Sequence, residues 1–175
     1  MSDVPIVESE RLRLRGHRRG DFEAIAAMWG NADVARFIGG RPSTREETWA
    51  RYLRYLGMWP ALGCGYWVIE EKASGRFLGE IGFMDAMREI TPSLEGLPEH
   101  GWALIPDAQG KGVASEAVQA TLAWGEGHFP DFEPVCMIAP ENAPSLKLAQ
   151  KFGYRPFAET TYKGAPTILL RRARA

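Results

Sequence analysis

The stretch 99–120, which reads EHGWALIPDAQGKGVASEAVQA, constrains the fold more than any other part of this chain. A short apolar run covers residues 102–105, and apolar residues recur at helical spacing from Val113 onward. Gly110 and Gly112 lie between these two patterns. Glycine lets the main chain approach a ligand closely, and the first N–H groups of a helix have no partner within the helix. The pattern predicts a strand, a glycine turn and a helix whose start binds phosphate, assisted by the helix dipole.

Three phosphate-binding motifs can be compared with this turn. A P-loop requires G-x-x-x-x-G-K-[ST], but Gly112 occupies the Ser/Thr position and residues 106–109 contain no glycine. A dinucleotide fingerprint counted from Gly110 requires Gly or Ala where Ser115 stands. The third pattern, Q/R-x-x-G-x-G/A, is satisfied by Gln109, Gly112 and Ala114.

With the Trp-x-Leu-x-Pro strand before it and Ser-Glu-Ala after it, this third pattern resembles the coenzyme A pyrophosphate loop of the GNAT N-acetyltransferases. Residues 8–15, followed by Asp21, resemble the family's opening "T-E-R-L-x-L-R…D". Residues 140–145, followed by 151–154, resemble its "N-x-x-S…K-x-G-F" segment. The blocks occur in family order, and the resemblance covers about the whole chain. It is closest to the branch of the ribosomal-protein N-terminal acetyltransferases RimJ and RimL.

Composition narrows the class of protein. A chain of 175 residues with 45% hydrophobic residues can bury a core as one domain, here residues 1–175. Its net charge of -1 gives no broad basic field, so neither nucleic acid nor membrane is expected as a partner. Cys64 and Cys136 lack metal-like spacing and are expected to be free thiols, with no metal site. Without a signal-like start or an 18-residue apolar run, the chain is expected in the cytoplasm.

Periodicity and turn residues predict a chain of alternating strand and helix groups. The expected fold class is α+β, with a mixed, mostly antiparallel sheet of about seven strands and helices on both faces. The GNAT resemblance further implies that the fourth and fifth strands splay apart and that pantetheine lies in the gap. Residues 84–98 are expected to form a long loop on the acceptor side. Predicted strands are 11–15, 65–70, 76–83, 102–105, 134–139, 154–161 and 167–170. Predicted helices are 22–30, 43–58, one from 113, and one that begins at Asn142 or Ser145 and ends at 152.

The resemblance also implies which residues hold acetyl-CoA. Main-chain amides near the glycine turn would bind the pyrophosphate, and the main chain of the preceding strand would pair with the pantetheine amides. Asn142 would bind the pantetheine arm or, alternatively, cap a helix. The expected cofactor-binding residues are Trp102, Leu104, Ile105, Gln109, Gly110, Lys111, Gly112, Val113, Ala114, Ser115 and Asn142.

Direct attack of an amine on a thioester needs a base for the amine and a proton for the thiolate. Many GNATs use a tyrosine as the acid, but Ala149 stands at the matching position here. Ser145 is the expected substitute, or else only a helix cap. Glu99 is the expected base, reaching water in the cleft, with His100 a competitor on the opposite strand face. Glu80 and Glu159 are weaker alternatives, and five aromatic residues either line the acceptor cleft or simply pack: Phe37, Trp49, Tyr52, Tyr55 and Trp59.

The sequence therefore predicts an acetyl-CoA-dependent N-acetyltransferase that acts on a primary amine by direct attack. The expected acceptor is a protein or peptide N-terminal α-amine, and the protein is expected to be a monomer or homodimer. One alternative is a small-molecule amine acceptor such as an amino acid, polyamine or antibiotic. Others are a non-catalytic acyl-CoA-binding module and a nucleotide-binding regulator.

Overall fold

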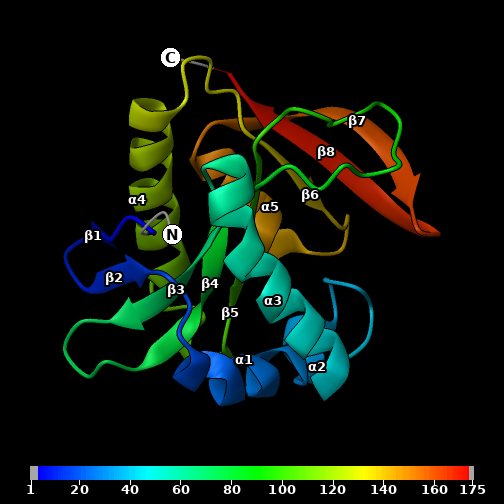
Figure 1. Ribbon diagram of the computed structural model, residues 1–175. Helices are drawn as coiled ribbons and strands as arrows, with labels where there is room; N and C mark the ends of the chain where they lie inside the picture. Colours follow the sequence, from blue (N-terminus) through cyan, green and yellow to red (C-terminus); the bar gives the residue numbers. More distant parts are fainter. Residues whose placement is uncertain (1–3, 174–175) are drawn as a thin grey trace.

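The computed structural model describes residues 4–173, so residues 1–3 and 174–175 of the predicted domain lie outside it. Figure 1 shows the elements in chain order. They are β1 Val7–Glu8, β2 Leu12–Arg15, η1 Arg19–Asp21, α1 Phe22–Trp29, α2 Ala32–Ala35, α3 Arg45–Leu62, β3 Tyr66–Glu71, β4 Phe77–Met84, β5 Glu99–Leu104, η2 Pro106–Ala108, α4 Val113–His128, β6 Val135–Ile138, α5 Ala143–Lys151, β7 Tyr154–Tyr162 and β8 Ala165–Arg172.

Within residues 4–173, eight strands form one sheet in the order β1-β2-β3-β4-β5-β6-β8-β7. Only β5 and β6 run parallel; the other neighbouring strands are antiparallel. The prediction of a mixed, mostly antiparallel sheet is confirmed. The predicted strand number was one too low because β1 was missed. Its two residues, which pair Val7 with Leu14, are too few to show a strand period.

The contact between β5 and β6 is limited to one end. Their ladder consists of a single pair, Glu99 with Val135. Figure 1 shows β6, β8 and β7 turning away from the half of the sheet that ends in β5. This is the expected splay between the predicted fourth and fifth strands, which become β5 and β6 once β1 is counted.

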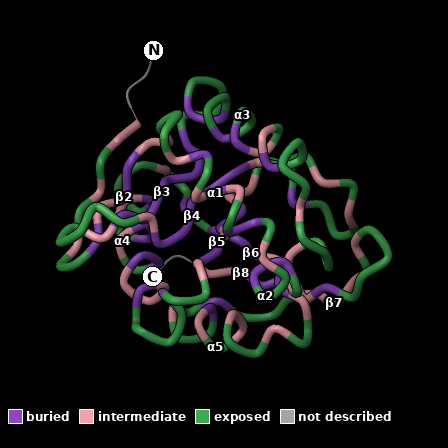
Figure 2. Tube along the Cα trace, turned by 90° about the horizontal axis from the view of Figure 1, so that it is seen from below, coloured by how far each residue is buried: buried purple, intermediate pink, exposed green. Residues whose placement is uncertain are grey.

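Helices cover both faces of the sheet. Figure 2 shows α3 on one side of the central strands and α4 and α5 on the other. The side chains of α4 pack on alternate residues of the strands, with Ala117 and Val118 in the same buried cluster as Trp67 and Phe83. On the opposite side, α1 and α3 bury a second cluster around Ile25. The central strands β3 and β4 are buried on both faces, so their alternating side chains divide the core between two helical layers.

Helix α3 begins and ends at the signals that its sequence carries. Thr44 accepts a hydrogen bond from Glu47 N, and the Glu47 carboxylate accepts one from Thr44 N, which forms a capping box. The helix continues past Met58, the predicted end, to Leu62. It stops at Gly63, whose φ of 70° is the left-handed conformation that favours glycine.

Residues 85–98 form a long loop without a helix or strand, as predicted. In Figure 1 this green segment passes in front of β6 and β8. Leu94 is buried in one cluster with Val135 of β6 and Leu169 of β8. The loop connects β4 to β5 but packs on the strands beyond the splay, so it spans the two halves of the sheet.

Candidate active site

The glycine turn has the conformation that a main-chain phosphate site requires. Gly110 and Gly112 have φ values of 71° and 78°, and Gly112 is the N-cap of α4. The first helical hydrogen bond runs from Glu116 N to Gly112 O at 3.1 Å. The amides of residues 113–115 precede it and therefore have no partner within the helix. Together with roughly half a positive charge from the helix dipole, they can bind an anion.

The turn is held by the N-terminal part of the chain. Glu116 accepts hydrogen bonds of 2.7 Å from Ser9 Oγ, Arg11 N and Arg11 Nε. Arg11 Nη1 also donates to Lys111 O at 3.1 Å. Lys151 Nζ lies 2.8 Å from Ser115 Oγ. Three cationic side chains, those of Arg11, Lys111 and Lys151, thus lie in or beside the turn.

Alternate residues of β5 direct their backbone N–H and C=O groups to opposite edges of the strand. Ile105 N donates to Leu78 O of the β4 side at 3.0 Å, and Val135 N of β6 donates to Pro98 O at 3.0 Å. In an antiparallel ladder, alternate residues turn both backbone groups to the same neighbour. Trp102 and Leu104 therefore direct N–H and C=O away from β4, into the splay. Their backbone groups have the direction that pairing with pantetheine amides requires.

Two predicted cofactor residues have partners within the protein. The N–H of Ile105 is used by the β4 ladder, which leaves no donor from this residue for the splay. Gln109 Nε2 donates to Leu104 O at 3.3 Å. Val113 is buried in the core, so only its main chain faces the turn.

Helix α5 brings Ser145 to β5. Asn142 is the N-cap, with its Oδ1 accepting from Ser145 N at 3.2 Å, and its two amide protons stay available. Trp102 Nε1 lies 3.3 Å from Ser145 Oγ. An indole nitrogen can only donate, so Ser145 Oγ is the acceptor and its own proton is free for another group. Ala149 is fully buried one turn further along the helix.

Glu99 lies in different surroundings from those expected. Its carboxylate is buried and accepts hydrogen bonds from Arg88 Nε at 2.5 Å and from Arg88 Nη2 at 2.6 Å. Arg88 also donates to Tyr162 Oη of β7 at 3.2 Å. The expectation of an open carboxylate in water is thus corrected, because the long loop places a guanidinium on it. Each carboxylate oxygen retains a lone pair for a further hydrogen bond.

His100 lies on the opposite face, as expected, and both ring nitrogens are occupied. Nδ1 lies 2.8 Å from Tyr154 Oη, and Nε2 lies 3.0 Å from Thr121 Oγ1. Thr121 donates its hydroxyl proton to main-chain carbonyls, so its oxygen accepts from Nε2–H, and Tyr154 donates to Nδ1. Burial, together with the charge of Arg172, lowers the pKa of His100 to about 3. A neutral imidazole inside the core satisfies this network.

The two cysteines are poor candidates for a covalent acetyl carrier. Cys64 and Cys136 are both buried. Burial raises the pKa of the Cys64 thiol to about 11 and that of Cys136 further still. Neither thiol is therefore available as a thiolate near neutral pH. This favours direct attack of the amine over a cysteine intermediate.

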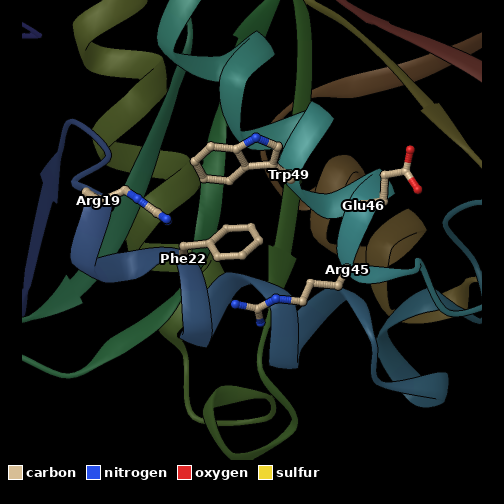
Figure 3. A pocket seen from close by; sticks show the side chains of 5 residues that line it. All are labelled: Arg19, Phe22, Arg45, Glu46 and Trp49. Atoms are coloured by element: carbon tan, nitrogen blue, oxygen red, sulfur yellow. The ribbon is translucent and has the colours of Figure 1, made fainter.

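An open hollow of about 470 Å³ lies elsewhere, between α1 and the start of α3. Figure 3 shows its lining: Arg19, Phe22, Arg45, Glu46 and Trp49. Arg19 stacks on Trp49 at 4.5 Å, and Arg45 lies 4.8 Å from the Phe22 ring. None of these residues belongs to β5, α4 or α5. Of the predicted wall aromatics, Trp49 lines this hollow, whereas Tyr52, Tyr55 and Trp59 are buried.

Sequence reasoning missed several residues around the splay. Arg88 lies in a loop without a period, and no local pattern pairs it with Glu99. Arg51 and Tyr66 belong to ordinary helix and strand patterns, and Tyr66 reaches Gly101 of β5 only through the sheet register. Within residues 4–173, no group of His, Cys, Asp or Glu has metal-ligand geometry, and no helix is long and apolar enough to cross a bilayer.

The chain is similar to known acetyltransferases of the GNAT family. The model of the acetyltransferase (GNAT) domain matches residues 11–155. The uncharacterized N-acetyltransferase YoaA of Bacillus subtilis (strain 168) is 25% identical over 152 residues, which cover 86% of this chain and 83% of YoaA. A solved structure from Bordetella pertussis, assigned to the GnaT acetyltransferase family, is 33% identical with a TM-score of 0.85. That match covers 97% of this chain and 100% of the other.

Two solved structures of lower identity share the fold. The spermidine N-acetyltransferase from Vibrio cholerae, in complex with CoA and spermine, is 18% identical with a TM-score of 0.71, covering 93% of this chain and 94% of that chain. The ribosomal L7/L12 α-N-protein acetyltransferase RimL is 16% identical with a TM-score of 0.77, covering 98% and 95%. At this identity the likeness concerns the fold alone.

Proposed function

Because this chain belongs to the GNAT acetyltransferase family, we propose that it transfers the acetyl group of acetyl-CoA to the α-amine of a protein or peptide N-terminus. The fold is shared by a spermidine N-acetyltransferase and by RimL, so it does not by itself choose between these acceptors. The choice rests on the buried carboxylates on the face of the sheet that α1 and α3 cover.

The residues present fit acetyl-CoA. Unbonded amides at the start of α4 would hold the pyrophosphate, with Lys111 adding charge. The backbone groups of Trp102 and Leu104 in the splay would pair with the pantetheine amides, and Asn142 Nδ2 would donate to the same arm. Ile105 and Gln109 contribute least, since the N–H of Ile105 is bonded to β4 and Gln109 is bonded to Leu104 O.

The acid and the base lie on opposite faces of β5. Glu99 is on the face covered by α1 and α3, whereas the Trp102 side chain reaches Ser145 on the face covered by α4 and α5. In the tetrahedral intermediate the attacking nitrogen must lose a proton and the departing sulfur must gain one. We assign the first transfer to Glu99, directly or through water. Ser145 Oγ–H would donate a hydrogen bond to the departing thiolate, which then takes up a proton from water. A backbone N–H in the splay would stabilise the oxyanion.

One observation carries the choice of acceptor: the buried carboxylates already have partners. Within residues 4–173 these are Glu70, Glu80 and Glu99. The Glu70 carboxylate accepts a hydrogen bond from Arg15 Nε at 2.6 Å. The Glu80 carboxylate is hydrogen-bonded to His17 Nε2 and Trp29 Nε1, each at 2.7 Å. Glu99 is paired with Arg88. A polyamine or a polycationic antibiotic needs uncompensated carboxylates, and this face provides none among its buried residues, which favours an acceptor with one positive charge.

The free energy of deprotonation also favours an α-amine over a lysine side chain. An α-amine has a pKa of about 7.7 to 8.0, and a lysine has one of about 10.4. Near pH 7, freeing the ε-amine costs about 3 to 4 kcal/mol more than freeing the α-amine. A single carboxylate whose oxygens are shared with an arginine is suited to the easier of these two tasks.

The test is to offer short peptides with free or blocked N-termini, with and without lysine, and with spermidine and an aminoglycoside as competing amines. Free thiol release measures turnover, and mass spectrometry locates the acetyl group. We expect acetylation at the free N-terminus. Acetylation confined to lysine or to non-peptide amines would overturn the acceptor assignment, and thermal stabilisation by acetyl-CoA without any transfer would indicate a binding module.

A further inference from the structure

The face of the sheet that α1 and α3 cover, which we call the acceptor face, lacks side chains at two neighbouring positions of β4 and β5. Gly82 of β4 and Gly101 of β5 lie opposite each other, and Tyr66 of β3 pairs with Gly82. A Cβ on Gly101 would lie 2.1 Å from Tyr66 Oη. The Tyr66 hydroxyl therefore rests on the β5 main chain, between Glu99 and the residue whose backbone faces the splay, Trp102.

Two residues of α3 extend this group. The rings of Tyr55 and Tyr66 stack with centroids 4.5 Å apart and an interplanar angle of 4°. Arg51 Nη1 lies 3.4 Å from Tyr55 Oη, and the Arg51 guanidinium lies 3.9 Å from the centre of the Trp29 ring. The Tyr66 hydroxyl on the glycine backbone is thus the member of this group nearest Glu99, and Arg51 lies beyond it, at the other end of the stacked tyrosines.

Arg51 has fewer partners than the other arginines of this face. Arg15 and Arg88 each hold a carboxylate at 2.8 Å or less. Within residues 4–173, no carboxylate lies within ion-pair distance of Arg51, and its buried Nε has no hydrogen-bond partner. Glu80, the neighbouring carboxylate, is already bonded to His17 and Trp29. Arg51 is half-buried and its Nη1 donates to Tyr55 Oη, so the donor without a partner is the buried Nε, and leaving it unbonded is unfavourable.

An oxygen from the acceptor would meet this requirement. An α-amino acyl group carries a carbonyl or carboxylate oxygen two bonds beyond the carbon that bears the amine. With the amine beside Glu99, the oxygen would extend along the same face toward the tyrosines. Simple alkylamines and polyamines carry no such oxygen.

We propose that Arg51, held by Tyr55 and assisted by the Tyr66 hydroxyl, binds the oxygen of the carbonyl or carboxylate next to the acceptor amine. This rests on the proposed function and deepens it: these residues select an α-amino acyl group over a simple amine. The guanidinium donates to that oxygen, which restores the hydrogen bonds that Arg51 lacks. In this role Arg51 positions the acceptor and takes no part in proton transfer.

The test compares three acceptors: an alanine-starting peptide amide, free alanine, and isopropylamine, which replaces the carbonyl group by a methyl group. Arg51→Gln should raise the KM for the peptide about tenfold to a hundredfold, with the KM for acetyl-CoA showing that the cofactor site is intact. The preference for peptide over isopropylamine, measured as a ratio of kcat/KM values, should fall by a similar factor. Arg51→Lys should recover part of that preference, and Tyr66→Phe should lower it less.

Arg54→Gln is the matched control, since Arg54 is an exposed arginine of the same helix. A loss confined to the peptide identifies its first carbonyl as the ligand, and a loss confined to free alanine identifies a carboxylate. If the parent acetylates the peptide and Arg51→Gln behaves like Arg54→Gln, the proposal for Arg51 is wrong and the proposed function stands. If the parent acetylates only isopropylamine or other simple amines, both are wrong.

Discussion

Trp102 Nε1 lies 3.3 Å from Ser145 Oγ, so the strand that faces the splay and the helix that carries the proposed acid are in direct contact. The contact orients the hydroxyl with its oxygen toward the indole and its proton outward. A serine is a weak acid, but a thiolate is a tolerable leaving group, with a thiol pKa of about 8.5. A hydrogen bond to the developing charge is therefore enough to assist its departure.

Ser145→Ala should lower kcat about tenfold to a hundredfold, at the lower end of the usual acid-base contribution. The KM for acetyl-CoA should change little, because the Ser145 main-chain bond to Asn142 is retained in alanine. Steady-state kinetics, with single-turnover experiments to show that chemistry limits the rate, check this. Trp102→Phe keeps the hydroxyl and is the milder control; equal kcat values for the parent and Ser145→Ala would leave Ser145 with a structural role only.

Glu99→Gln should lower kcat/KM for a peptide acceptor by about a hundredfold near pH 7, because the amide cannot accept the proton. The loss should shrink as the pH approaches 9, where the free α-amine predominates in solution. Glu159→Gln is the matched control, since Glu159 is exposed in β7 and was a weaker candidate for the base. A pH-independent loss in Glu99→Gln would indicate a structural role for the ion pair with Arg88.

Gly112→Val should raise the Kd for CoA about thirtyfold, since losing two backbone hydrogen bonds costs about 2 kcal/mol. Part of any effect comes from backbone strain, because φ is 78° and a valine there costs about 1–2 kcal/mol of stability. Gly164→Val carries the same strain in the β7–β8 turn, where φ is 80°. Calorimetry and thermal unfolding of both variants separate the effects: both should melt earlier, and only Gly112→Val should bind CoA weakly.

His100 should make the free energy of unfolding depend on pH. The unfolded chain protonates this histidine below about pH 6.5, whereas the folded protein, with a pKa of about 3, does not. Stability is therefore full above pH 6.5 and should fall by up to about 1.4 kcal/mol per pH unit as the pH decreases toward 3. His100→Gln should lose this part of the slope in urea titrations between pH 7 and 4. Parallel slopes for parent and variant would show that His100 does not titrate in this range.

Local signals were enough to predict most of the fold. The glycine turn, the Thr44 capping box and the alternation in β2 act between neighbours in sequence, so each element shows its own pattern. Strand β1 was not predicted, because two residues are too few to show a strand period. The end of α3 was predicted too early, at Met58, because the helix continues to the glycine stop at Gly63. The splay between β5 and β6 came from the family resemblance, since pairing across the sheet depends on distant residues.

The site was less predictable, and the reason is physical. The N-cap role of Asn142 follows from its place before a helix, but the Arg88 contact with Glu99 depends on how a long loop folds back. The position of the Tyr66 hydroxyl over Gly101 requires the register of β3, β4 and β5 together. Backbone directions at Trp102 and Leu104 depend on the same register and involve no side chain, so a residue pattern alone does not reveal them.

The hydrogen bonds from Ser9 and Arg11 to Glu116 have a consequence for the order in which the protein is assembled. Arg11 and Glu116 are 105 positions apart, so the glycine turn is completed only when a long segment of chain has closed. During synthesis, Ser9 and Arg11 are made well before α4 and can form these hydrogen bonds only after α4 has been synthesised. Contacts of this separation form slowly and late. A chain that begins after Arg11 would contain every amide of the turn but would lack the residues that fix its geometry.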